Sequence, residues 1–127
     1  MAIDETKIVV IILFLSILTI VIVNYREKTN FVKIIYFRRT SCIIVNKTDQ
    51  IIAEIENKLG NKIEVKTVNL DNEENLTEEE KQLKEEHQII GVPEIIINGK
   101  EYTKEFTKEE LGKEICNKFL IKPEGCR

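Results

Sequence analysis

The chain has 127 residues, enough for one domain of ordinary size and little more. Its formal net charge of −3 argues against nucleic acid as a partner, because a phosphate-binding domain needs a basic stripe. Hydrophobic residues make up 43% of the chain, and many of them are concentrated near the N-terminus.

Residues 8–23 form an apolar run that only a serine and a threonine interrupt. At about 1.5 Å per residue, such a run nearly crosses a hydrocarbon core of roughly 30 Å. Because the run is apolar on every face, a core helix made from it would have to be covered on all sides. The rest of the chain is too small to do that. No small-x-small cleavage site follows it, which argues against a cleaved signal peptide. We therefore expect an anchor and stalk over residues 1–28 and a soluble domain over residues 29–127.

Two features of the chain predict opposite orientations in a membrane. The run is followed by Arg26, Lys28 and Lys33, and the positive-inside rule would keep such a flank in the cytoplasm. Cys116 and Cys126, however, lie on either side of a short turn, and a structural disulfide between them would persist outside the reducing cytosol. On the second feature, we expect a single-pass membrane protein with an extracytoplasmic domain.

The first half of the domain alternates strand and helix signals. Apolar and aromatic residues predict a strand over 32–37, and alternating polar and apolar residues predict another over 62–70. Between them a helix is expected over 42–59, ended by Gly60. That helix is expected to bury one stripe, Ile44, Ile51, Ile52, Ile55 and Leu59.

The second half contains two capping boxes and a hairpin signal. Thr77 opens a predicted helix that ends near residue 87, and Thr107 opens the last one, which is expected to bury apolar residues at helical spacing. Residues 94–97 predict a strand, and Asn98-Gly99 predicts a tight turn to a partner strand over 100–104. The order β-α-β-α-β-β-α predicts an α/β domain with a four-stranded mixed sheet and helices on both faces.

This order resembles the thioredoxin fold over about residues 31–120. Phe37 lies five residues before Cys42, as the last core residue of the first strand precedes the first active-site cysteine of that family. Val92-Pro93 resembles the cis-proline step that faces the active site. The resemblance implies a thioredoxin-like domain preceded by one transmembrane helix.

The chain departs from the family pattern at Ser41, before the cysteine, at Glu94, after the proline, and at two positions that matter more for catalysis. Val45 stands where the second cysteine of Cys-x-x-Cys is found, and Tyr36 stands where thioredoxin has a buried acid. A dithiol enzyme needs the second thiol to resolve its mixed disulfide. The last helix of this topology usually ends far from the active site, so neither C-terminal cysteine is expected to replace it. A self-contained dithiol oxidoreductase is therefore not expected.

Cys42 supports two interpretations. As the nucleophile of a monothiol oxidoreductase, its thiolate would be stabilised by the helix N-terminus, with support from Arg38 and Arg39. Alternatively, it is a semi-buried structural cysteine left after a catalytic pair was lost, since Cys is also a common small buried residue. The apolar neighbours Ile43 and Ile44 favour this second interpretation, because burial raises the pKa of a thiol and blocks access to it. The first interpretation predicts exchange with protein, peptide or low-molecular-weight disulfides.

A hypothesis of a different class needs no catalysis. The resemblance implies a substrate groove at Ser41, Val45, Val92, Pro93 and Glu94, and a non-catalytic binding module would hold a peptide or a partner protein there. The predicted partners are therefore the membrane and protein or peptide thiols and disulfides. No Cys and His spacing typical of a metal site occurs, so we predict neither a metal nor a cofactor.

Overall fold

The computed structural model describes residues 3–26 and 30–127. The predicted flank residue Lys28 and the predicted domain boundary at 28/29 lie outside the described residues. Helix α1 (Glu5–Arg26) is long and apolar enough to cross a membrane, a property that spans share with signal sequences. Its Ser16 and Thr19 hydroxyls donate to backbone carbonyls four residues back, at 2.8 and 2.7 Å, so the apolar run leaves neither hydroxyl without an acceptor.

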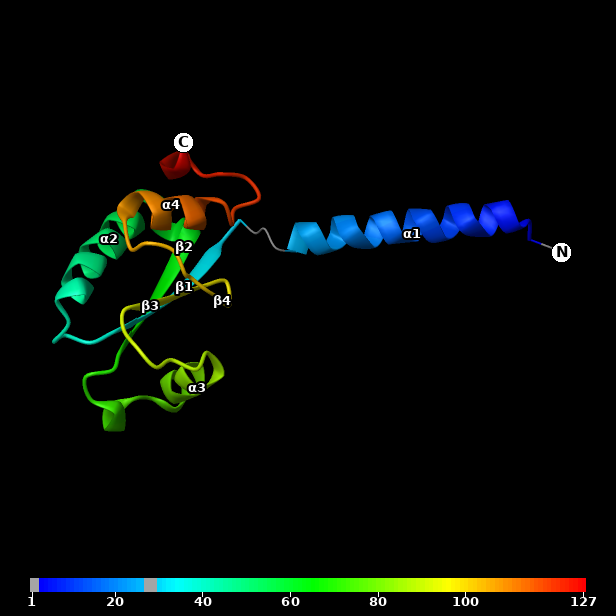
Figure 1. Ribbon diagram of the computed structural model, residues 1–127. Coiled ribbons are helices and arrows are strands. Elements are labelled where there is room, and N and C mark those ends of the chain that lie inside the picture. The colour runs from blue at the N-terminus through cyan, green and yellow to red at the C-terminus, as the bar shows by residue number, and fades with distance from the viewer. Residues whose placement is uncertain (1–2, 27–29) are drawn as a thin grey trace.

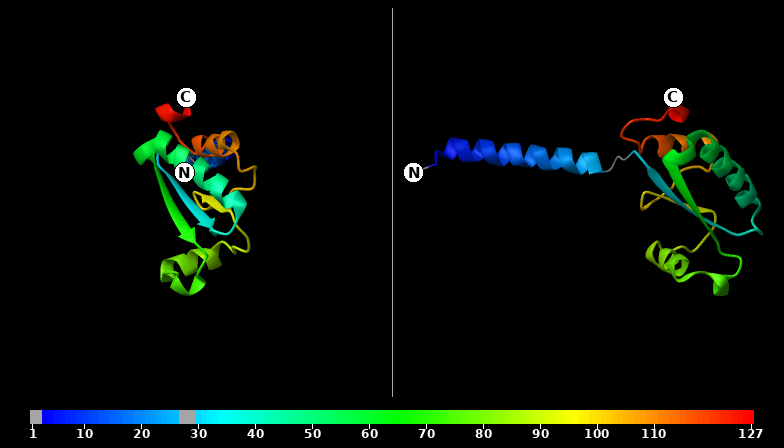
Figure 2. Two further views of the ribbon diagram at one scale, coloured as in Figure 1. Left: turned by 90° about the vertical axis from the view of Figure 1, so that its left-hand side faces the viewer. Right: turned by 180° about the vertical axis from the view of Figure 1, so that it is seen from behind.

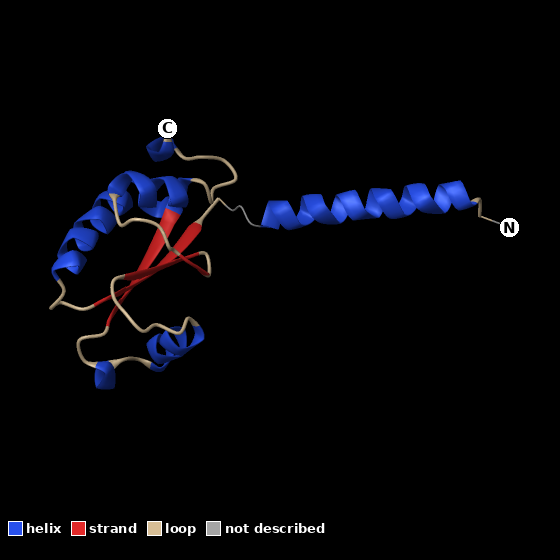
Figure 3. Ribbon diagram, viewed as in Figure 1, coloured by secondary structure: helices blue, strands red, loops and turns tan. Residues whose placement is uncertain are grey.

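The domain is built on one four-stranded sheet with the order β2-β1-β3-β4 (Figures 1 and 3). The strands are β1 (Val32–Arg38), β2 (Ile63–Asn69), β3 (Glu94–Ile97) and β4 (Lys100–Glu101). β1 is parallel to β2, and β3 is antiparallel to both β1 and β4. The sheet is therefore mixed, as the element order predicted.

Helices cover both faces of the sheet (Figure 2). α2 (Ile43–Leu59) and α4 (Lys108–Cys116) lie on one face, and α3 (Glu78–Glu86) lies on the other. Thr77 and Glu80 form the predicted capping box of α3. The Thr107 side chain caps α4 by accepting from the Glu110 N–H at 3.2 Å.

Each face of the sheet has its own apolar cluster, because successive side chains of a strand point to opposite faces. Val32, Ile34 and Tyr36 of β1 pack in the cluster that includes α2 and α4. Ile35 and Phe37 pack in the second cluster, on the α3 face. The central strand is therefore covered on both faces.

Two local predictions were wrong. Ile44 is 59% exposed, and the buried stripe of α2 instead begins at Val45 and continues through Thr48. A threonine can fill that position because its hydroxyl donates to the Ile44 carbonyl at 2.9 Å. β4 also stops at Glu101, short of the predicted residue 104. The Tyr102 N–H still donates to the Ile95 carbonyl at 2.8 Å, and the Tyr102 side chain is buried.

The two ends of the sheet carry different parts of the chain. The end where β1 begins, which we call the base, holds residues 30–33, 58–63, 97–100 and 117–127 (Figure 1). The other end, which we call the Cys42 end, holds the loop from β1 to α2 and the start of β3. The base therefore follows directly on the segment that joins α1 to the domain.

A disulfide fixes the C-terminal tail to the base. The predicted pair Cys116 and Cys126 is bridged, with 5.7 Å between the two Cα atoms. The tail also packs tightly on α2, because a Cβ atom built on Gly125 would lie 2.7 Å from the Lys58 carbonyl oxygen. Only glycine fits there. Residues 117–127 are therefore held both by the disulfide to α4 and by the packing of Gly125 on α2.

Candidate functional site

Cys42 is the N-cap residue of α2, with φ −94° and ψ 123°. Its carbonyl accepts from the Val45 N–H at 3.1 Å, and its thiol is unbridged and half-buried. The side chain makes no capping hydrogen bond. The thiol therefore lies at the positive end of a 17-residue helix, beside backbone N–H groups of its first turn.

The loop that delivers Cys42 is tied to the end of β2. The Thr40 N–H donates to Asp71 Oδ1 at 2.8 Å, and the Thr40 hydroxyl donates to Asp71 Oδ2. These bonds, that of the hydroxyl above all, lower the pKa of the Asp71 carboxyl. Ser41, between Thr40 and Cys42, is exposed. The carboxylate thus holds the loop while leaving the residue before the thiol in solvent.

The two isoleucines that follow Cys42 are themselves largely exposed. Ile43 is 87% exposed and Ile44 is 59% exposed. Both belong to the first turn of α2 and point away from the sheet, whereas the core-facing side of that turn is occupied by Val45. The two isoleucines therefore do not mark a buried stretch, but the Cys42 thiol itself is half-buried, as the structural interpretation expects.

Val45 is fully buried. Its side chain lies on the sheet-facing side of α2. The prediction that Val45 lines a substrate groove was therefore wrong. Its carbonyl accepts from the Tyr36 hydroxyl at 3.3 Å. The residue three positions after Cys42 is thus part of the apolar core.

The sequence analysis missed Asp49, an acidic residue of α2 that bonds to β1. Asp49 Oδ1 accepts from the buried Tyr36 hydroxyl at 2.8 Å, and the Asp49 carboxylate accepts two bonds from Arg38, at 3.1 and 2.9 Å. Burial, together with the Asp49 carboxylate, raises the pKa of Tyr36 well above its usual value. Tyr36, Arg38 and Asp49 therefore form one cluster that joins β1 to α2.

The two arginines proposed to support the thiolate both have carboxylate partners. Arg38 is held by Asp49, and Arg39 Nη2 lies 3.1 Å from Glu73 Oε1. Glu73 also contacts Lys84, on α3, at 2.8 Å. In the described parts of the chain, no hydrogen bond joins either guanidinium to Cys42. Their visible role is to fasten the β1–α2 connection.

The Val92-Pro93 peptide bond is cis and leads directly into β3. Glu94, the next residue, lies across from Phe37 of β1, so this segment is at the same end of the sheet as Cys42. A pocket of about 320 Å³ lies beside Pro93 and is lined by residues 90–94, 101–104 and Phe106. Cys42 does not line this pocket, so the predicted groove residues are divided between the pocket and the helix terminus.

Glu94 and Glu101 form an acidic pair in this pocket. Burial raises the pKa of Glu94 to about 7, and a hydrogen bond and charge repulsion from Glu101 act in the same direction. One proton shared between the two carboxyl groups relieves their repulsion. Near neutral pH the pair therefore changes charge.

We predict that Glu94→Gln flattens the pH dependence of stability. Between about pH 4.5 and 7 the folded chain binds the Glu94 proton more tightly than the unfolded chain, so the free energy of unfolding falls as pH rises through this window. Allowing for solvent screening, the fall is roughly 1–2 kcal/mol. Denaturant unfolding at pH 5 and pH 8 should show Glu94→Gln more stable than wild type at pH 8 only. Glu64→Gln, an exposed carboxyl on β2, should leave the slope unchanged, and an unchanged slope in Glu94→Gln would contradict the assignment.

No group of His, Cys, Asp and Glu side chains that could hold a metal ion occurs within residues 3–26 and 30–127.

The sheet order and the helices on both faces are those of a thioredoxin-like fold. The structure is similar to the thioredoxin Mala s 13 of Malassezia sympodialis (TM-score 0.53, 18% identity, 72% of this chain and 78% of that one). It is also similar to the germline-specific thioredoxin Deadhead of Drosophila melanogaster (TM-score 0.53, 14% identity, 72% and 83%) and to a malarial protein (TM-score 0.53, 20% identity, 72% and 100%). No protein-family model and no curated protein matches the sequence. The likeness is thus one of fold.

Proposed function

We propose that this chain is a membrane-anchored thioredoxin-like protein that carries out monothiol–disulfide exchange through Cys42. The observation that carries the proposal is the position of the Cys42 thiol, which is free and half-buried at the N-cap of α2. Helix N-termini favour the thiolate, which is the nucleophilic form. The exposed Ile43 and Ile44, which follow it, offer an apolar contact for a substrate.

The proposed reaction has two exchange steps and no net redox change in the protein. The Cys42 thiolate attacks one sulfur of a disulfide R–S–S–R′, forming a Cys42–S–S–R bond and releasing R′–S⁻. A second thiol, such as glutathione or a thiol of a partner protein, then attacks the mixed disulfide. It takes R with it and returns the Cys42 thiolate. Because Val45 carries no thiol, the second step depends on this outside reductant.

The proposed location is a membrane surface outside the cytosol. The apolar helix α1 supports the anchor. The Cys116–Cys126 bridge supports an oxidising compartment, since structural disulfides are rare in the cytosol. In this arrangement residues 1–28 are the anchor and stalk, and residues 29–127 are the domain.

The test is the reactivity of Cys42 in the full chain held in detergent. We expect oxidised glutathione to add one glutathione to the wild type and reduced glutathione to remove it, both followed by intact mass. Cys42→Ser should take up none, and the bridged Cys116 and Cys126 serve as internal controls. A thiol that reacts only after denaturation would refute the exchange function.

An alternative proposal is a binding module without catalysis. The pocket beside Pro93 and the fully exposed Ile90 at its rim favour it, because together they offer an apolar contact next to a strand start. In this case Cys42→Ser would keep full function in cells, whereas in the exchange mechanism the same variant loses it.

A further inference from the structure

The segment between α1 and the domain is short. Residues 27–31 separate the end of α1 from Val32, the first residue of β1. A fully extended chain of that length reaches about 17 Å. If α1 lies in a bilayer, as proposed above, the base of the domain is therefore confined to the neighbourhood of the lipid headgroups.

The base carries an excess of cationic side chains. They are Lys33, Lys58, Lys62, Lys100, Lys118, Lys122 and Arg127, against the carboxylate of Glu124 within the base and those of Glu56 and Glu64 next to it in the sequence. None of the ion pairs found within the described residues uses Lys58, Lys62 or Lys122. The Cys42 end, in contrast, is rich in carboxylates, among them Asp71, Glu73, Glu74 and Glu94.

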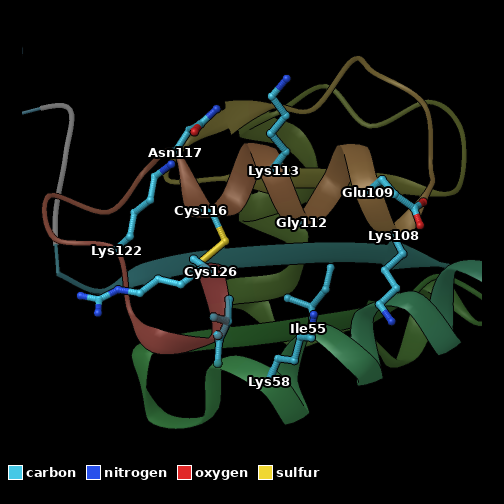
Figure 4. A pocket seen from close by; sticks show the side chains of 13 residues that line it. Ile55, Lys58, Lys108, Glu109, Gly112, Lys113, Cys116, Asn117, Lys122 and Cys126 are labelled. Carbon is cyan, nitrogen blue, oxygen red and sulfur yellow. A yellow bond between two sulfur atoms is a disulfide. The ribbon is translucent and has the colours of Figure 1, made fainter.

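The tail presents apolar side chains beside these cations. Leu120 is 45% exposed and Ile121 is 68% exposed, in the loop between α4 and Cys126 that the disulfide closes. Figure 4 shows Lys122 on the tail and Lys58 on α2 around this bridge. Because the tail is fixed by the bridge and by its close packing on α2, Ile121 and Lys122 are held at the surface of the base.

We infer that the base of the domain docks on a bilayer surface that contains anionic phospholipids. Lys58, Lys62 and Lys122 contact the headgroup phosphates, and Leu120 and Ile121 enter the boundary between headgroups and acyl chains. This inference rests on the proposed anchor, since α1 is what brings the base to the membrane. It adds a defined face to that anchor and does not depend on the chemistry of Cys42.

The chain contains no tryptophan, so an introduced one reports a single position. We would place Ile121→Trp at the base and Ile90→Trp, which is fully exposed in the loop before Pro93, as the matched control. Each full-length variant is put into nanodiscs of phosphatidylcholine alone or with about 30% phosphatidylglycerol, and quenching by nitroxide lipid is measured. We expect about threefold stronger quenching at position 121 with the anionic lipid, and little quenching at position 90.

Charge reversal identifies the contact. Lys62→Glu with Lys122→Glu should abolish the extra quenching at position 121, whereas Lys47→Glu with Lys81→Glu, the same charge change away from the base, should leave it in place. High salt should act like the first pair. Equal quenching at positions 121 and 90 in a chain that co-migrates with the nanodiscs would overturn the docking while the anchor stands. A chain that does not co-migrate would overturn both, and glutathione uptake by Cys42 in the same samples reports separately on the exchange function.

Discussion

Replacing Val45 with cysteine should shorten the lifetime of a mixed disulfide at Cys42 by about 100-fold or more in the absence of added thiol. In the wild type only an outside thiol can release the adduct. In Val45→Cys a thiol stands on the same first turn of α2, so the attack becomes intramolecular. The measurement is intact mass over time after Cys42 has been loaded with glutathione and the excess removed. The product is a disulfide between Cys42 and the introduced thiol, with release of glutathione.

The control for this change is Val45→Ala. Val45 is fully buried, so both variants remove core volume and should lose about 1–2 kcal/mol of stability. Only the cysteine variant can resolve the adduct. The adduct could instead live equally long in Val45→Cys and Val45→Ala. The side chain at position 45 would then be unable to reach the sulfur of Cys42. Positions 42 and 45 would not correspond to the two cysteines of a Cys-x-x-Cys motif.

Replacing Asp49 with alanine should lower the free energy of unfolding by about 2–3 kcal/mol. The change leaves the buried Tyr36 hydroxyl with only the Val45 carbonyl at 3.3 Å, and it leaves Arg38, whose side chain is 19% exposed, without its carboxylate. Denaturant unfolding of the full chain measures the loss. Tyr36→Phe, combined with Asp49→Ala in a double-mutant cycle, isolates the hydroxyl–carboxylate bond, for which we expect about 1 kcal/mol of coupling.

A matched carboxylate on the same helix shows whether burial makes the difference. Glu54 pairs with Lys108 at 2.9 Å, but both side chains are about half exposed. Glu54→Ala should therefore cost less than about 0.5 kcal/mol. A loss of the same size in Glu54→Ala and Asp49→Ala would show that the Tyr36–Asp49–Arg38 cluster has no special role in joining β1 to α2.

The sequence was sufficient for the order of the elements because each one carries local chemistry. The capping residues Thr77 and Thr107 begin their helices, and Asn98-Gly99 turns β3 into β4. Asn98 adopts φ 48° and Gly99 adopts φ 83°, the left-handed conformation that this turn requires. The places where these helices and strands begin and end could therefore be predicted, because they depend on residues that act on their immediate neighbours.

The surroundings of Cys42 were harder to predict because they depend on packing between elements. The helix pattern does not single out Asp49, and its partner Tyr36 lies on a strand. A usable signal was present, since a tyrosine at an inward position of β1 needs a partner for its hydroxyl. The exposure of Ile44 was missed for a similar reason. Hydrophobicity predicts that α2 has an apolar face, but only packing against the sheet decides whether Ile44 or Val45 lies on that face.

The direction of β1 has a consequence for which disulfides this thiol can meet. The strand starts at the base, and its seven residues carry the chain about 23 Å toward the Cys42 end. With α1 in a bilayer, the base against it and β1 upright on that surface, the sulfur would stand about that far above the headgroups. A disulfide close to the membrane span of another protein then lies below its reach, whereas one carried on a neighbouring ectodomain at matching height is accessible. In that arrangement, the length of the strand would select substrates by their height above the lipid.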